Sequence, residues 1–172
     1  MNLKELFSDK STKVKEKVDL LSNAVLNGEI SVNEVIAFAS SSKDPVKASC
    51  IESLEFASQG NPGIMDKESF KFVTESLSEK APRIKWESAK VIGNTAKLFP
   101  DSLENAITKL IENTAHEGTV VRWSAAFALG EILNINQGLK NRLLDTLKDI
   151  SEKEEKNSIK KIYQKAIKIA EK

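Results

Sequence analysis

This sequence contains few of the residues on which catalysis, metal binding and covalent cross-linking depend. Its 172 residues include one cysteine, Cys50, and one histidine, His116. A single cysteine excludes an internal disulfide, and no Cys/His ligand spacing, HExxH pattern or Gly-rich phosphate loop occurs. His116 has no neighbouring motif that supplies a nucleophile and an orienting acid, so we interpret it as a solvated loop residue. We therefore expect no metal, no cofactor and no enzymatic activity.

Long apolar runs and a strong net charge are also missing. No window approaches the roughly 18 apolar residues of a membrane span, and residues 1–7 lack the apolar run of a signal peptide. The composition is 40% hydrophobic and 30% charged, with a formal net charge of +1. These values are typical of a globular protein and show no overall bias toward nucleic acid. We expect a cytoplasmic protein in which residues 1–172 form a single domain.

One pattern is repeated four times along the chain, and its most complete copy spans residues 119–130. The copies are spaced 37 or 38 positions apart and each contains a cation at the same place: Lys47, Lys85, Arg122 and Lys160. A period in this range indicates a stacked-repeat protein, in which each unit buries its apolar face against its neighbours. No segment alternates with period two, so we expect no β-sheet.

Each copy resembles the first helix of a HEAT repeat, in which Asp-Pro is followed by a β-branched residue, Arg or Lys, two small residues and Ala-Leu-Gly. The match is fullest in the two central copies, which end on Gly93 and Gly130, whereas Glu55 and Lys168 replace the glycine in the outer copies. The resemblance implies an all-α fold: an α-α superhelix, a HEAT-like, right-handed solenoid of about four to five helix pairs. Its first helices are expected near 44–58, 82–98, 119–134 and 157–171.

Helix-start signals agree with this reading. Ser31 is followed three residues later by Glu34, which predicts a capping box, and Asp66 precedes another apolar-periodic stretch. Asp101 is predicted to cap a further helix, with Glu104 completing a capping box.

The four cations at the shared repeat position allow two interpretations. They could form a phosphate track, or each could pair with an acid or a helix end in the adjacent unit. We favour the structural role, because ladders of repeat-signature residues serve stacking.

Trp86 and Trp123 occupy the same repeat position and should point away from the layer of second helices, with Gly93 and Gly130 leaving room beside each indole. They form either an exposed binding pair or, as we favour, packing between neighbouring first helices. If Trp123 is packed, its replacement by alanine should cost about 3–5 kcal/mol.

The two tryptophans also resemble those of the HEAT-like DNA-alkylation-repair glycosylases, which present Trp, Asp and Arg to a lesion in duplex DNA. This chain is shorter, has no Asp near either Trp, and lacks the expected excess of Lys and Arg. A nucleic-acid-binding protein related to these enzymes therefore stays an alternative, as does a regulatory subunit of a larger assembly.

We expect a non-enzymatic protein-interaction module or scaffold. In the HEAT family the second helix of each pair lines the concave face, so the resemblance implies that the exposed side of those helices binds the partner. Five acids outnumber two lysines there, which favours a basic or amphipathic protein segment over nucleic acid, and Phe38 and Phe72 are candidate apolar anchors. The predicted partner-binding residues are Glu34, Phe38, Phe72, Glu75, Glu79, Asn105, Lys109, Glu112, Asn141, Asp145 and Lys148.

Overall fold

The chain folds into ten α-helices and contains no strand, as the repeat pattern predicts. A computed structural model describes all 172 residues. The helices are α1 (Leu3–Ser8), α2 (Val14–Leu26), α3 (Val32–Ser40), α4 (Asp44–Gly60), α5 (Lys67–Ser76), α6 (Pro82–Thr95), α7 (Leu103–Asn113), α8 (Thr119–Leu133), α9 (Gln137–Lys153) and α10 (Asn157–Ala170). None of them is both long and apolar enough to cross a membrane.

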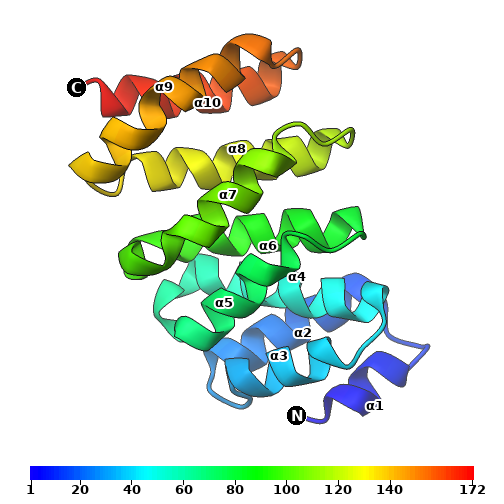
Figure 1. Cartoon of the computed structure of the whole chain (residues 1–172). Coiled ribbons are helices and arrows are strands. Elements are labelled where there is room, and N and C mark those ends of the chain that lie inside the picture. Colours follow the sequence, from blue (N-terminus) through cyan, green and yellow to red (C-terminus); the bar gives the residue numbers. More distant parts are fainter.

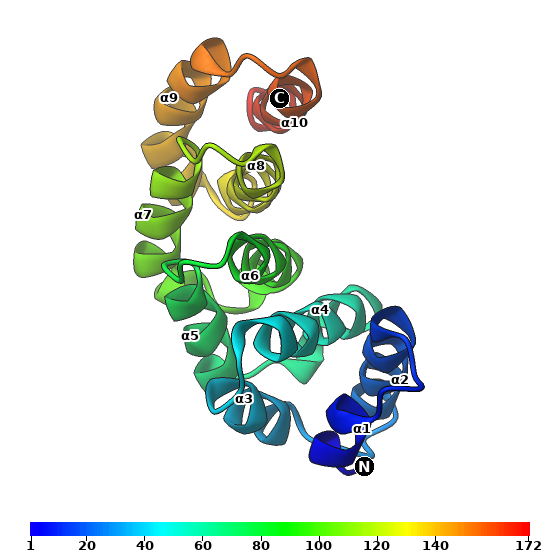
Figure 2. The same cartoon turned by 90° about the vertical axis from the view of Figure 1, so that its right-hand side faces the viewer.

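The helices form two layers that wind into an arc. The signature helices α4, α6, α8 and α10 stack side by side, and α3, α5, α7 and α9 cross them in the second layer (Figure 1). In the view that shows α6, α8 and α10 nearly end-on, the signature helices and α2 lie on the inner side of the arc, and the other layer forms its outer side (Figure 2). The short helix α1 lies against the N-terminal end of the arc (Figure 2).

The size of the side chains between neighbouring helices determines which layer lies on the inside of the curve. Neighbouring helices of the inner layer pack closely on one another, whereas neighbours in the outer layer touch much less. The buried positions of the inner helices are rich in small residues, which let two helix backbones approach: Ala48, Ser49, Ser53, Ala57, Ser88, Ala89, Gly93, Ser124, Ala125, Ala126, Ala128 and Gly130. The layer with the shorter spacing becomes the inner face of the curve.

Two glycines set the closest of these approaches. A Cβ atom on Gly93 of α6 would overlap the ring of Phe127 from α8, and one on Gly130 of α8 would lie 3.1 Å from Ala166 Cβ of α10. The space beside Gly93 is therefore taken by a phenylalanine of the next inner helix. From the sequence, Gly93 is expected to leave room for the indole of Trp86, and this expectation is wrong.

The capping predictions are confirmed at two helices and wrong at a third. Ser31 forms a capping box with Glu34 at the start of α3, and Asp66 forms one with Ser69 at the start of α5. At α7 a 3₁₀ turn spans Pro100–Ser102, which places Asp101 inside the turn. The helix begins at Leu103 behind Ser102, whose side chain makes no capping hydrogen bond.

Three of the four ladder cations join the inner layer to the outer one, as the structural interpretation predicts. Lys47 Nζ lies 2.5 Å from Glu79 Oε1, just beyond the end of α5. Lys85 Nζ donates to the carbonyl of Leu77 at 3.0 Å and to Asn113 Oδ1 at 3.1 Å, at the ends of α5 and α7. Burial lowers the pKa of Lys85, with Glu112 acting in the opposite direction.

Arg122 makes the third connection. Its guanidinium donates to Glu154 Oε2 at 3.1 Å, at the end of α9, and to the carbonyls of His116 and Glu117 after α7. In the last copy Lys160 makes no ion pair and no side-chain hydrogen bond. The ladder cations thus connect the inner helices to the ends of outer helices and do not form a phosphate track.

The hydrophobic core is one cluster of 41 buried residues that continues through the arc. Cys50 belongs to it, and burial raises the pKa of its thiol to about 12. A thiol in this environment stays protonated and unreactive at neutral pH.

The glycine contacts generate a stability prediction. Gly93→Ala should lower the free energy of unfolding by about 1–3 kcal/mol, since the added methyl group must displace the Phe127 ring in a packed interface. Gly138→Ala is the matched control, because that exposed glycine in the first turn of α9 has its nearest neighbour at 3.4 Å and alanine favours the helix. Urea denaturation monitored by circular dichroism measures both, and equal stabilities would contradict the close-approach argument.

The ladder generates a second prediction. Lys85→Met should destabilise the fold by about 1–3 kcal/mol, because Asn113 Oδ1 loses its donor inside the protein. Lys160→Met removes a cation from the equivalent repeat position, where it has no partner, and should change stability by less than about 0.5 kcal/mol. Thermal or urea unfolding of the two variants compares them directly, and a large effect at Lys160 would mean that the ladder acts through charge alone.

Candidate interaction surface

The predicted binding residues lie on the outer side of the arc. They belong to α3, α5, the turn after α5, α7 and α9. The placement of these residues on the concave face is therefore wrong, although their partner-binding role stays a prediction: Glu34, Phe38, Phe72, Glu75, Glu79, Asn105, Lys109, Glu112, Asn141, Asp145 and Lys148. The physical reason is the packing described above, because the small residues that draw helices together lie in the signature helices and put those helices inside.

Several of these outer residues are engaged within the protein. The Phe38 ring stacks on Phe7 of α1 at 5.8 Å between centroids, and the Lys47 ammonium lies 5.3 Å from the centre of the Phe72 ring. Both phenylalanines are partly buried against the core. The two candidate apolar anchors are therefore packing residues.

Some of the predicted charged residues are also paired. Lys109 Nζ donates to Ser78 Oγ at 2.6 Å, and Lys148 Nζ lies 2.6 Å from Glu171 Oε1. Phe72 and Glu75 line a hollow of about 300 Å³ between α3 and α5. The structure brings only these neighbouring outer residues together, and it spreads the remainder along the convex surface.

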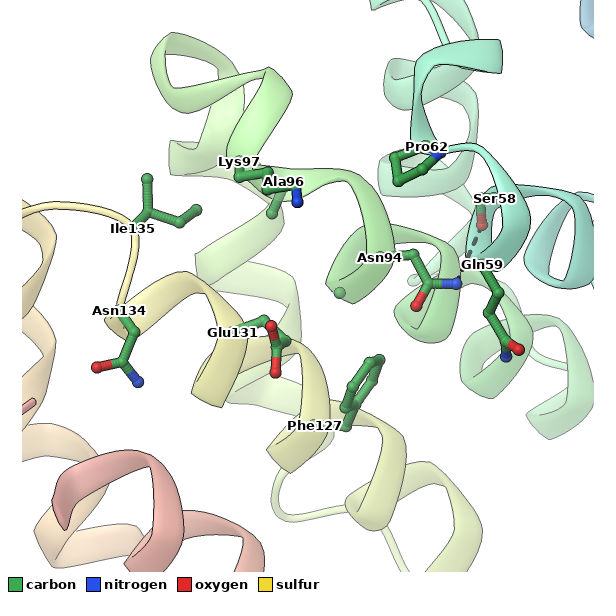
Figure 3. Close-up of a pocket in the computed structure, with 11 residues that line it drawn as sticks. Ser58, Gln59, Pro62, Asn94, Ala96, Lys97, Phe127, Glu131, Asn134 and Ile135 are labelled. Carbon is green, nitrogen blue, oxygen red and sulfur yellow. Dashed lines mark hydrogen bonds between the residues drawn. The ribbon is translucent and has the colours of Figure 1, made fainter. Parts of the chain in front are cut away.

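The concave face is the exposed side of α4, α6, α8 and α10, and its largest hollow measures about 600 Å³. It lies at the C-terminal ends of α4, α6 and α8, and the side chains of Asn94 from α6 and Phe127 from α8 line it (Figure 3). Asn94 Nδ2 donates to the carbonyl of Glu55 at 3.2 Å and to Ser58 Oγ at 3.0 Å. These bonds fix the amide at the edge of the hollow.

A second hollow of about 230 Å³ continues the first toward α10. Phe127, Glu131 and Asn134 line both, so the two hollows form one groove along the inner surface. In the second hollow, Trp123 of α8 faces Lys165 of α10. We call the combined depression the inner groove.

The two tryptophans differ in environment. Trp86 is half-buried, and its Nε1 donates to Glu87 Oε1 at 2.6 Å. Trp123 is 40% exposed and stacks on Phe127, with 6.0 Å between ring centres. The packing interpretation therefore describes Trp86 better than Trp123, whose ring forms an exposed wall of the inner groove.

Beside Trp86, two carboxylates are buried between α4 and α6. Glu55 and Glu87 are each 3% exposed, and Lys90 Nζ lies 3.4 Å from an oxygen of Glu55 and 2.9 Å from one of Glu87. Burial raises the pKa of Glu87, while the Lys90 ammonium and the Trp86 N–H act against that rise. The single ammonium group of Lys90 thus pairs with both carboxylates.

At the rim of this cluster Arg83 pairs with Glu52. The five charged groups consist of three carboxylates and two cations, so the cluster carries one excess negative charge. Phe56, 40% exposed, lies beside it, with Lys90 Nζ 6.0 Å from its ring centre. This part of the concave face combines an exposed aromatic ring with unbalanced negative charge.

Sequence reasoning missed Phe56, Asn94, Phe127 and Glu131 as surface residues of the concave face. All lie on helices with the repeat signature, and a helical wheel drawn for those helices would have found them. No group of three or more His, Cys, Asp or Glu side chains is arranged to hold a metal ion. The groove offers aromatic faces, amides and charges, which suit binding of an extended segment.

No protein-family model and no curated protein matches this sequence. Solved structures do resemble it in fold. An engineered protein has a TM-score of 0.79 at 18% identity, over 98% of this chain and 79% of that one. A designed armadillo repeat protein has a TM-score of 0.76 at 14% identity, over 98% and 80% of the two chains.

A second designed armadillo repeat protein, solved in complex with the peptide (KR)4, has a TM-score of 0.73 at 14% identity, over 98% of this chain and 79% of that one. At these identities the likeness concerns the fold alone. This chain has the fold of the armadillo-like and HEAT-like α-solenoids.

Because Trp123 is exposed, its replacement by alanine should lower the free energy of unfolding less than is expected from the sequence for a packed ring. Trp123→Ala should lower the free energy of unfolding by about 1–2 kcal/mol, because much of the ring faces solvent. The replacement of a fully packed aromatic ring would lower it by about 3–5 kcal/mol. Trp86→Ala is the matched comparison and should cost more, since it removes a better buried ring and leaves a buried Glu87 oxygen without its donor. Urea unfolding curves of the two variants measure the difference, and a larger loss at Trp123 would contradict the observed burial.

Proposed function

We propose that this protein is a non-enzymatic interaction module that binds an extended protein segment along the inner groove. One observation carries the proposal: the stacked pair of Trp123 and Phe127 lines the inner groove, with Phe127 in both hollows and Trp123 in the second. Aromatic side chains that are exposed beside a preformed depression are typical anchors of protein recognition.

Two further features favour a polypeptide partner. Glu131 and Asn134 add polar groups to the apolar wall, so the groove offers both hydrophobic contact and hydrogen bonds. The designed armadillo repeat protein in complex with (KR)4 has a similar fold. By analogy with it, we propose a basic or amphipathic segment, whose cations would lie over the excess negative charge beside Glu52 and Glu87.

Nucleic acid is the second candidate ligand, because exposed stacked rings next to lysines are also found where single strands bind. The carboxylates of the concave face weigh against it. Glu131 lines both hollows of the groove and would repel a phosphate backbone there.

The proposal predicts that ligand binding depends on the concave face and not on the convex one. The measurement is a titration of the purified protein with (KR)4 and with peptides selected from a random twelve-residue display library. A dye-labelled peptide supplies the signal for every variant, because the substitutions on the concave face remove Trp123 itself. Trp123→Ala combined with Phe127→Ala should weaken binding at least about tenfold, as expected for loss of a central aromatic anchor.

The double reversal of Glu75 and Glu112 to lysine is the matched control on the convex face, measured with a dye-labelled peptide. It should leave affinity within about twofold, apart from salt-dependent long-range effects. If the convex reversal abolishes binding and the concave substitutions do not, the partner binds the residues first predicted from the sequence. If no peptide binds and an oligonucleotide does, the proposal is wrong.

A further inference from the structure

The inner helix α10 exposes charges of one sign only. The helix, Asn157–Ala170, contains four lysines and no acidic residue. Three of these lysines lie at positions i, i+4 and i+7, which places them within about 60° of one another on one stripe of the helix. The exposed cations of this stripe and of the turn that follows it, which we call the lysine face, are Lys161, Lys165, Lys168 and Lys172.

The lysine face has no acidic partner within the protein. None of its four ammonium groups makes an ion pair or a side-chain hydrogen bond, whereas Lys71, Arg142 and Lys148 of the outer layer each pair with a carboxylate. Glu171, the acid nearest to these lysines in sequence, is the partner of Lys148. The lysines of α10 therefore repel one another, and no paired carboxylate offsets the repulsion.

Exposure to solvent explains polar residues on this face but not their uniform charge. The exposed charged residues of α2, at the other end of the inner layer, are of both signs: Lys15, Glu16 and Asp19. Mixed charges keep a surface soluble and limit like-charge repulsion along a helix. The single sign on α10 is therefore not required by solvation, and it fits an anionic partner.

A hollow without any acidic lining residue adjoins the lysine face, where α8, α9 and α10 meet. It measures about 310 Å³, and its charged lining residues are Lys140 of α9 and Lys172. Lys140 is also without an ion pair. Leu133 and Ile169 supply an apolar wall, and Ile169 is 50% exposed. This basic hollow therefore offers an apolar contact together with two free cations.

We propose that the lysine face and the basic hollow bind an acidic segment of another protein, with carboxylates at the lysines and an apolar side chain against Ile169. The surface adjoins the inner groove, whose second hollow also contains Lys165 and Ile169, but it extends beyond that groove. The inference goes beyond the proposed function, because it concerns a second partner with the opposite charge.

The spacing of the lysines suits a short extended segment. Lys161 and Lys168 are separated by about 10 Å along the helix axis, at 1.5 Å per residue. Three or four residues of an extended chain cover roughly that distance. Each free ammonium would gain a close opposite charge without the loss of an existing pair, which is the condition for electrostatic complementarity.

The apolar wall favours a polypeptide over other anionic partners. An acidic segment can present carboxylates to the lysines and an apolar side chain to Ile169 at the same time. The bases of a single-stranded nucleic acid bind by stacking on aromatic rings, and no aromatic side chain lines the basic hollow. A flat layer of lipid headgroups would reach the lysines and leave the hollow empty.

The test uses dye-labelled nine-residue peptides with one apolar residue at the centre and flanking residues that are all glutamate or all glutamine. Fluorescence anisotropy measures their affinities at low and at physiological salt. The glutamate peptide should bind at least about tenfold more tightly than the glutamine peptide at low salt, and the advantage should shrink as salt screens the charges. Equal affinities of the two peptides would overturn the proposal.

Lys165→Glu combined with Lys168→Glu should weaken binding of the glutamate peptide at least about tenfold. The matched control is Lys15→Glu combined with Lys67→Glu, which changes the net charge equally at exposed, unpaired lysines of α2 and α5. It should leave the affinity within about twofold. Circular dichroism checks that both double variants are folded. If both weaken binding equally, the peptide responds to net charge alone and the lysine face is not its site.

Ile169→Ser tests the basic hollow separately, because it removes part of the apolar wall without changing the charge. It should weaken the glutamate peptide about threefold or more, as expected for an apolar contact at a binding site. An unchanged affinity would contradict the role of the hollow.

The outcomes separate this inference from the proposed function. Trp123→Ala combined with Phe127→Ala should leave the affinity of the glutamate peptide within about threefold, because neither ring lines the basic hollow. If that variant loses the glutamate peptide, the peptide binds in the inner groove, and this inference fails while the interaction module stands. Tighter binding of single-stranded DNA or of phosphatidylserine vesicles than of the glutamate peptide at physiological salt also overturns the inference.

Discussion

The close approach of the inner helices is the constraint on which the rest of the structure depends. Glycine, alanine and serine at the buried positions of α4, α6 and α8 let these helices pack at short spacing, with Gly93 admitting the Phe127 ring. The outer helices contact each other less because larger side chains fill the space below them. The difference in spacing bends the stack and decides which exposed side chains face the concavity.

Polar contacts then hold the two layers in register. Lys47, Lys85 and Arg122 reach from the inner layer to the ends of outer helices, where they bond carboxylates, an amide and free backbone carbonyls. Helix C-termini carry unsatisfied carbonyl groups and partial negative charge, so a cation is well placed there.

The same geometry gives the concave face its chemical character. Each inner helix exposes only a narrow stripe of residues, because its other sides are covered by neighbours in its own layer and by the outer helices. The stripes carry an aromatic ring and bound carboxylates on α4 and α6, two stacked rings on α8, and free lysines on α10. An ordered series of different stripes lets a solenoid read several successive residues of a partner, since each helix contributes one position.

The sequence by itself determined the all-α repeat architecture, the caps at Ser31 and Asp66, and the structural role of the cation ladder. These features depend on local periodicity and on residues that recur at one interval, and both are visible in a single chain. The helix start near Asp101 was mispredicted, because the 3₁₀ turn at Pro100 displaces it and the competition between turn and helix is not visible in a capping pattern.

The identity of the concave face was decided by the tertiary structure. Which layer lies inside the curve depends on the spacing between helices that are about 37 residues apart in sequence, and this spacing results from contacts such as Gly93 with Phe127. Because the assignment of layers was reversed, the residues predicted for the concave face lie on the convex one, and Phe38 and Phe72 are packed. The sequence could mark the helices with exposed stripes, but only the packed stack showed which stripes face a common groove.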